Sequence, residues 1–579
     1  MAKQAAAQQA AALIKTTKKA GYRMVFHCHP QTVSQARVLA VFVVVIATLV
    51  TAAPAHAVLT DSLTIGNAKA ISLGHAVTAD PPGIDSIHFN PAGLVKLKGR
   101  QSHLKVVAGT FSIDMEFGDY DPDTAAVIQD YTNQGYFPDS YYFNDAYKSK
   151  STTEGASLML PFFGMTDAPL LLAPLGGASY SPPGSDITYA TNVYSPMMVG
   201  FYRAEDDPGR WIGQRMSFMQ ITYFSPSFAY RVNDSFSFGG AMTFNYGGVG
   251  FELPFRGGNP SIFGLGELQA TTLDCANASP DNPRPTDFLC GGTFSPYEEL
   301  GYLAMEVETP LAIGFNVGLL WEPTEWMSVG VSYVAPIPMT LKGDFTWTSS
   351  DSWLSVIVPL AQSNLYGSIE NLVQALGYSL PDTSTVTEGK ATLDLEMPEL
   401  FNIGTSIQLS PNIKLNVDYK FSGWSSWEDL PLEFSKPINF LRLAEFVGES
   451  TRNALVFPLG LEDTWNWAVG MEYQWSDRTV LRFGIEDRPT SLPSDGLTPL
   501  LPMGSGKLYG AGVGIKMRNG GQMDFGIAYF QNSLDMPSGT SPLGNDTDPL
   551  NFIYNPFFGT DTKTDLSVLL LEFSISQPF

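Results

Sequence analysis

The chain has 579 residues, 12% of them aromatic, and a formal net charge of −24. So large an acidic excess excludes nucleic acid as a partner, because binding a phosphate backbone requires a basic surface. Beyond residue 57 no stretch approaches the roughly eighteen uncharged apolar residues of a membrane-spanning helix, so this part can cross a bilayer only as a closed β-barrel.

The first 57 residues predict a secretory signal peptide. Residues 1–37 carry six basic residues and no acid, an apolar run of thirteen residues follows at 38–50, and Ala55-His56-Ala57 offers a small-x-small cleavage site. A single transmembrane anchor is the alternative, but this run is too short to span about 30 Å of hydrocarbon as a helix. The export that we expect also predicts a loop-stapling disulfide between Cys275 and Cys290.

The segment 58–100 lacks the two-residue period that begins after it. Its small residues and the turn Asp80-Pro81-Pro82 predict a compact domain with short helices. Two placements are open for this domain: a tail in the periplasm, or a plug inside the lumen of a barrel.

Alternating apolar and polar side chains predict strands along residues 101–579. In 235–246 and in 413–421 the large apolar residues share one face and the polar residues share the other. The apolar face must meet lipid, because a charge facing the bilayer midplane costs roughly 2–4 kcal/mol. The last residues, 565–579, alternate in the same way and end on Phe579, which is typical of a closing barrel strand. The predicted strands are 103–117, 155–163, 169–180, 216–232, 235–252, 302–321, 327–345, 389–409, 413–423, 465–475, 479–488, 508–518, 522–531 and 566–579.

The connections between these strands alternate between short and long. Tight turns are predicted at 164–167, 233–234, 322–326, 410–412, 476–478 and 519–521, whereas the intervening connections are long loops. Short periplasmic turns and long extracellular loops are the pattern of an outer-membrane barrel. We therefore predict an all-β fold, a membrane-spanning antiparallel β-barrel of fourteen strands in the bacterial outer membrane.

The run FNPAGLVKLKG at 89–99 resembles the hatch signature of the FadL family of long-chain fatty acid and hydrocarbon channels. Further similar blocks lie at 225–242, 315–345, 397–430 and 465–495, in the order of the family. The resemblance implies a fourteen-stranded barrel with an N-terminal hatch at 58–100, whose motif falls on Asn90, Pro91 and Ala92.

The resemblance also implies a route for a hydrophobic ligand, from a groove between extracellular loops to a lumenal pocket and out through a kink in the third strand. Pro174, Gly176 and Gly177 interrupt the predicted strand 169–180 and are the candidate lateral opening. An edge irregularity without function is the alternative.

Two further sets of residues are candidates for ligand binding. The resemblance implies that the groove falls on the loops 253–301 and 346–388. In loop 346–388 apolar residues recur near helical spacing, although these helices could equally pack on loop 253–301. The groove candidates are Trp353, Leu354, Ile357, Leu360, Leu365, Ile369 and Leu372. By strand parity the inward cations are Arg231, Lys414, Lys420, Arg482, Lys516 and Arg518, which could hold a fatty-acid carboxylate or pair with lumenal acids.

No nucleophile elbow and no calcium-loop motif occur, so we expect no catalytic residue, no metal and no cofactor. The predicted function is uptake of long-chain fatty acids or other hydrophobic molecules by ligand-gated passive diffusion with lateral exit. The alternative is a structural or adhesive barrel whose loops bind a partner. The other expected partners are outer-membrane lipid, lipopolysaccharide and the barrel assembly machinery, and we expect a monomer.

Overall fold

The computed structural model describes residues 63–579, except 136–143, 259–266, 278–289, 291–296, 364–365, 446–447, 449–450, 552 and 554. The predicted signal peptide, residues 1–57, lies outside the described residues. Within the described part of the chain, no helix is both long enough and apolar enough to cross a membrane.

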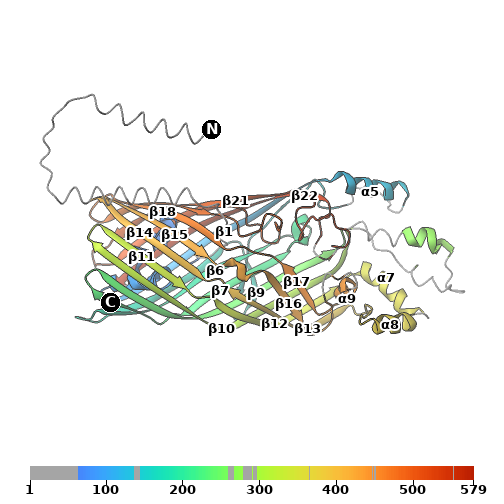
Figure 1. Ribbon diagram of the computed structural model, residues 1–579, viewed down its shortest axis with the longest axis horizontal. Coiled ribbons are helices and arrows are strands. Elements are labelled where there is room, and N and C mark those ends of the chain that lie inside the picture. Colours follow the sequence, from blue (N-terminus) through green and yellow to red (C-terminus); the bar gives the residue numbers. More distant parts are fainter. Residues whose placement is uncertain are drawn as a thin grey trace, which may run out of the picture. The chain divides into compact units, whose positions relative to one another are not determined.

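One antiparallel sheet of twenty strand segments closes on itself (Figure 1). It closes where β1 (Gly99–Tyr120) pairs with β22 (Thr560–Pro578), from Gln101 opposite Pro578 to Tyr120 opposite Thr560. Because six spanning strands consist of two segments each, the result is a closed barrel of fourteen antiparallel strands, as predicted.

The spanning strands differ in whether they are continuous. Besides β1 and β22, the uninterrupted strands are β6 (Ile187–Tyr202), β9 (Phe236–Arg256), β10 (Glu299–Thr324), β19 (Thr479–Arg488), β20 (Gly506–Lys516) and β21 (Gln522–Met536). The paired segments are β2 (Lys150–Thr152) with β5 (Leu171–Ser181), β7 (Arg215–Phe224) with β8 (Ser227–Asn233), β11 (Met327–Val334) with β12 (Ile337–Ser349), β13 (Val386–Met397) with β14 (Leu400–Ser410), β15 (Ile413–Ser422) with β16 (Asp429–Phe434), and β17 (Ala454–Pro458) with β18 (Thr464–Gln474).

The predicted alternation is confirmed on these strands. On β9 the side chains of Ser237, Thr243 and Asn245 are buried in the barrel, whereas Phe238 and Met242 are exposed on its outer face. Apolar side chains on the outside suit lipid, and polar ones on the inside bond to one another or to the N-terminal segment. The two-residue period therefore sets which residues can take part in a lumenal site.

The prediction is wrong at the start of the barrel, although the strand total is right. Residues 155–163 do not span the wall, because β3 (Ala156–Leu160) pairs with β4 (Gly164–Ala168) in a separate two-stranded sheet. The predicted loop 181–215 instead contains β6, the third spanning strand. A proline inside a run argues against a strand, and here a register shift between Tyr194 and Met197 accommodates Pro196.

Helices lie at one end of the barrel, opposite the C-terminus (Figure 1). They are α5 (Pro122–Asn133), α7 (Asp351–Gln362) and α8 (Tyr366–Ala375), with α9 (Asn439–Ala444) close by. The Ser350 hydroxyl accepts from Trp353 N (3.1 Å) and so caps the start of α7. Short helical turns are η3 (Pro208–Trp211), η5 (Leu268–Thr272), η6 (Cys275–Asn277) and η8 (Trp424–Ser426), and a disulfide joins Cys275 to Cys290.

The N-terminal segment, residues 63–98, packs against inward-facing side chains on opposite walls of the barrel. It contains α3 (Ala68–Ser72), η1 (Gly83–Asp85), α4 (Ser86–Phe89) and η2 (Pro91–Lys96). Glycines make room for it, since a Cβ at Gly510 would collide with the carbonyl oxygen of Ile71, and one at Gly318 with the side chain of Asn90. A side chain at either position would push the segment away from the wall.

Candidate functional site

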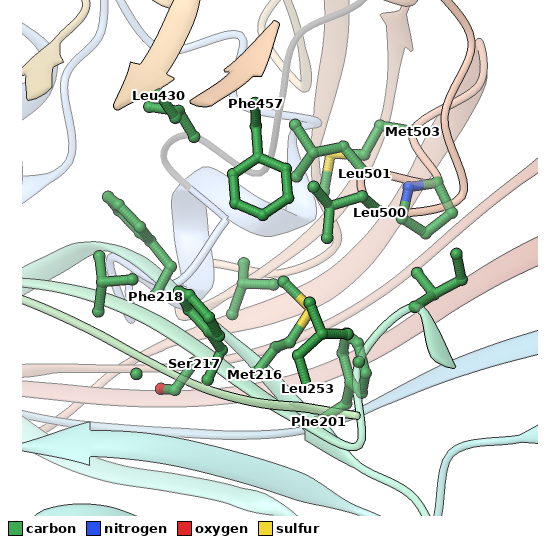
Figure 2. Close-up of a pocket in the computed structure, with 18 of the residues that line it drawn as sticks. Phe201, Met216, Ser217, Phe218, Leu253, Leu430, Phe457, Leu500, Leu501 and Met503 are labelled. Carbon is green, nitrogen blue, oxygen red and sulfur yellow. The ribbon is translucent and has the colours of Figure 1, made fainter. Parts of the chain in front are cut away.

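An apolar cavity of about 160 Å³ lies inside the barrel, toward the end that carries the helices. Figure 2 shows Phe201, Met216 and Leu253 on one side of it and Phe457, Leu500 and Met503 on the other. The first group comes from β6, β7 and β9, and the second from β17 and the loop after β19. The long extracellular connections therefore fold inward and complete the cavity.

Almost no polar atom faces this cavity. Ser217 and Trp427 are the lining residues whose side chains carry a polar atom, and Trp427 Nε1 donates to Glu396 O (2.7 Å). Such a surface offers a ligand apolar contact and no charged partner. An apolar cavity of about 150 Å³ is known to stay dry and to bind benzene, so this one suits a molecule of similar size.

A smaller cavity of about 30 Å³ adjoins the first and is bordered by Arg256. The guanidinium is buried, bonds to Pro556 O (2.9 Å), forms an ion pair with Asp145 and lies over the rings of Trp211 and Tyr297. Within the described residues, its Nη2 atom has no hydrogen-bond acceptor. Arg256 is thus a buried cation at the edge of the apolar cavity, and sequence parity did not identify it.

The hydrogen-bonded wall is interrupted beside the cavity. Pairing of β5 with β6 runs only from Tyr180 opposite Tyr189 to Gly176 opposite Val193, and residues 171–175 have no partner on β6. Beyond this point β6 lines the cavity with Met197, Val199 and Phe201, while β1 contributes Phe111 and Ile113. The cavity therefore borders the stretch where two neighbouring strands separate.

The predicted kink residues lie at this interruption, with Pro174 inside the unpaired stretch and Gly176 and Gly177 at its edge. Pro174 stands opposite Val106 in a β1–β5 ladder without a register shift, and β5 belongs to the second spanning strand, not the third. Gly176 and Gly177 are the last paired residues before β6 departs. The irregularity in the third strand is at Ser195 and Pro196, where one extra residue of β6 faces β7.

The predicted lumenal cations do not line the apolar cavity. Four of them bond within the barrel: Lys414 Nζ to Asp80 (2.8 Å), Lys420 Nζ to Glu486 (2.9 Å), Arg482 Nε to Glu472 (2.9 Å) and Arg231 Nη2 to Val95 O (3.3 Å). Lys516 and Arg518 are exposed near the turn between β20 and β21. Most of this set thus holds the N-terminal segment and the strand acids together.

Asn90 of the predicted hatch motif is fully buried and links three parts of the structure. Its Nδ2 donates to Thr78 O (2.8 Å) and to Leu319 O on β10 (2.9 Å), and its Oδ1 accepts from Ala92 N (3.1 Å). Pro91 begins η2, where a missing N–H costs nothing. The motif therefore fixes a turn of the N-terminal segment to the barrel wall.

A buried ionic cluster joins the same segment to β1 and β6. Asp85 accepts from Lys105 Nζ (2.5 Å), Asn192 Nδ2 (2.6 Å) and Asn67 Nδ2 (2.7 Å). Farther along β6, Ser195 O accepts from Thr64 Oγ1 (3.1 Å). The N-terminal segment thus contacts β6 where that strand leaves β5.

A second contact holds the N-terminal segment through the side chain of His75, which is neutral. Burial lowers the pKa of His75 to about 4, against the opposing effect of Glu486, so the ring is neutral at pH 7. Its Nδ1 then donates to Glu486 Oε2 (2.9 Å). The segment is therefore held by hydrogen bonds on the β19 side of the barrel as well as on the β6 side.

The predicted groove residues do not form one exposed surface. Trp353, Leu354 and Ile357 of α7 pack into the interior, where the Trp353 ring meets Phe440 of α9 at 6.0 Å. Leu360 and Ile369 are half-buried, Leu372 of α8 is exposed, and Leu365 lies outside the described residues. The helices thus pack on α9 through α7, and of these residues Leu372 remains open to the outside.

Comparisons with known proteins agree with this geometry. A family model described as outer membrane protein transport protein (OMPP1/FadL/TodX) matches residues 43–538. A long-chain fatty acid transport protein of Escherichia coli O6:H1 is 20% identical over 313 residues, which cover 54% of this chain and 59% of that protein. One from Salmonella typhi is 20% identical over 335 residues, covering 52% and 68%.

Solved structures show the same fold. A FadL homologue of Pseudomonas aeruginosa has a TM-score of 0.59 at 16% identity, covering 91% of this chain and all of the other. The toluene transporter TbuX of Ralstonia pickettii has a TM-score of 0.51 at 14% identity, covering 87% and 97%.

A closed fourteen-stranded barrel with an apolar outer face is a multi-pass protein of the bacterial outer membrane. This chain belongs to the OMPP1/FadL/TodX family of outer-membrane transport proteins for hydrophobic compounds, which are channels rather than enzymes.

Proposed function

We propose that this protein takes up small hydrophobic molecules across the outer membrane by passive diffusion. The observation that carries the proposal is the apolar cavity beside the interrupted wall between β5 and β6. A ligand leaves water for this cavity and gains about 0.8 kcal/mol for each buried CH₂.

The lining favours an uncharged hydrocarbon as the ligand. A carboxylate in the cavity would lose its hydration and find no charged partner among the lining residues. The toluene transporter TbuX, a structural neighbour, is a transporter of such a compound. We expect the purified protein to bind toluene more tightly than a fatty acid of equal carbon number.

The cavity is tested by placing a charge in it. Leu500→Glu should abolish toluene binding measured by calorimetry, because the carboxylate would attract water into the cavity. Leu376→Glu, at an exposed residue directly after α8, is the matched control and should bind normally. Equal affinity in both variants would remove the cavity from the ligand's path.

A long-chain carboxylate is the second candidate, supported by Arg256. The curated relatives are described as long-chain fatty acid transport proteins, and Nη2 of Arg256 is free to donate at the edge of the cavity. In that case Arg256→Met should weaken fatty-acid binding and leave toluene binding intact. Unchanged fatty-acid affinity in this variant would leave the hydrocarbon as the ligand.

We further propose lateral exit through the wall between β5 and β6. A hydrophobe leaving here enters lipid directly, whereas the periplasm would expose each CH₂ to water again. Deleting Pro196 removes the extra residue of β6, and the regular ladder should follow β5 and close the wall. We expect uptake by intact cells to fall while ligand binding persists.

The barrel supplies a matched control for this deletion. β10 carries a comparable register shift between Thr309 and Ala312, which contains Pro310 and lies away from the cavity. Deleting Pro310 should leave uptake unchanged. If both deletions transport at the rate of the unmodified protein, the ligand does not leave between β5 and β6.

The N-terminal segment, the predicted hatch, is proposed as the gate. It contacts opposite walls of the lumen and bonds to β6 at Asn192 and Ser195, so a movement of β6 on ligand binding would loosen it. Two-state gating of this kind requires that ligand bind the open arrangement more tightly than the closed one.

A further inference from the structure

The β3–β4 hairpin lies on the outer face of the barrel wall. Met159 and Met165 of the hairpin cover Gly248 and Gly250 of β9, where an added Cβ would come within 2.6 Å of Met159 Cγ and 3.0 Å of Met165 Sδ. These glycines alternate in phase with Phe238 and Met242, which are exposed on the lipid side. The hairpin is therefore outside the wall and rests on a strip without side chains.

Polar contacts hold the hairpin in one position. Arg215 donates to Met165 O (3.1 Å) and Asp167 Oδ1 (3.1 Å), and also pairs with Glu252 (2.5 Å). Near the turn, Glu306 Oε1 accepts from Met165 N (3.2 Å). A hairpin fixed at its strand β4 and near its turn presents the turn rigidly.

The turn displays two phenylalanines. Phe162 is 96% exposed and Phe163 is 80% exposed, and Phe162 has a φ of +69°, which a bulky residue rarely adopts. In water these rings would leave a large apolar surface solvated, at a cost of several kcal/mol. The two exposed rings are therefore more stable in an apolar environment than in water.

The height of the turn identifies that environment. On the outer face of β10 the apolar series from Trp321 ends at Leu311, and the next outward residues are Glu308 and Glu306. Glu306 contacts the turn, so the turn lies where the lipid-facing band meets the charged rim. Aromatic residues concentrate at this boundary in membrane barrels.

We propose that Phe162 and Phe163 insert into the outer leaflet at the boundary of acyl chains and head groups. The hairpin meets β6 through Gly155 opposite Tyr202, at the far end of the stretch of β6 that follows Val193 and has no partner on β5. It thereby anchors the outer side of the interrupted wall in lipid. The inference concerns lipid contact alone and holds whether or not a ligand leaves there.

Nitroxide depth measurement in lipid bilayers tests the proposal. The label is placed at F162C and F163C in the mature protein, whose Cys275 and Cys290 are joined in a disulfide, with V317C in the lipid-facing band and L376C directly after α8 as references. We expect both labels to report a depth of about 5–10 Å below the lipid phosphates, with oxygen accessibility close to that of V317C.

Two results would overturn the proposal. Accessibility to a water-soluble nickel reagent equal to that of L376C would place the turn in water. Labels that reach neither oxygen nor nickel would show that the turn packs against protein, either its own loops or a second copy of the chain. Wild-type heat-modifiable gel migration of each variant confirms that the barrel is folded.

Discussion

Neutralising Asp85 should release the N-terminal segment from the barrel wall. Asp85 and Lys105 are both about 1% exposed, and Lys105 Nζ also donates to Ile65 O (3.1 Å). Removing one member of a buried ion pair costs about 3–5 kcal/mol, because the remaining charge stays buried without its counterion. In Asp85→Asn the equilibrium for release should rise between about a hundredfold and a few thousandfold.

The assay is ion conductance of single proteins in planar bilayers. Asp85→Asn should show openings that the unmodified protein lacks, if release of the segment opens the lumen. The control is Asp344→Asn, which breaks an exposed pair with Lys390 (2.6 Å) and changes stability by only about 0–1 kcal/mol. If a folded Asp85→Asn protein conducts no more often than the Asp344→Asn protein, the ionic cluster at Asp85 does not hold the N-terminal segment in the closed arrangement.

Three further changes probe the same segment and the loops. Asn90→Ala removes three hydrogen bonds and should make the closed arrangement about 1.5–4 kcal/mol less stable, so the open fraction should rise in the same conductance assay. Gly510→Ala should also open the lumen, because its Cβ meets the segment's backbone, whereas Gly367→Ala has open space and should stay closed; equal conductance would contradict this. Replacing Cys275 and Cys290 by Ser frees a loop of sequence separation 15 and should speed its proteolysis by the equivalent of about 3 kcal/mol while leaving barrel stability unchanged.

The barrel was predictable where strands obey the two-residue period. β9, β15 and β22 meet lipid on one face and the lumen on the other, so their sequences alternate. β6 escaped because it carries Pro196 and lines an apolar cavity, so its inward residues Met197, Val199 and Phe201 are as apolar as lipid-facing ones. β3 was predicted as a spanning strand because it lies against the outer face of the wall, although it pairs with β4 and not with a strand of the barrel.

The cavity was less predictable than the wall. Leu500, Leu501 and Met503 belong to a connection without regular structure, and no period in the sequence shows that it turns inward. The six cations assigned by parity do alternate with apolar residues. Parity gives the face of the strand on which a cation lies, but it does not give the acid or carbonyl to which the cation bonds. Acids such as Asp80, from the N-terminal segment, decided where Lys414 points.

β6 is the element that the cavity and the N-terminal segment share. Asn192 and Ser195 bond to the segment, and Met197, Val199 and Phe201 line the cavity. Shifting a two-state equilibrium from 1:99 to 99:1 requires a difference in ligand affinity of about 5.5 kcal/mol between the two states. At about 0.8 kcal/mol for each buried CH₂, that difference corresponds to roughly seven methylene groups buried only in the open state. A hydrocarbon of about that size is therefore the smallest ligand whose burial alone could drive the gate, and shorter ones should bind without opening it.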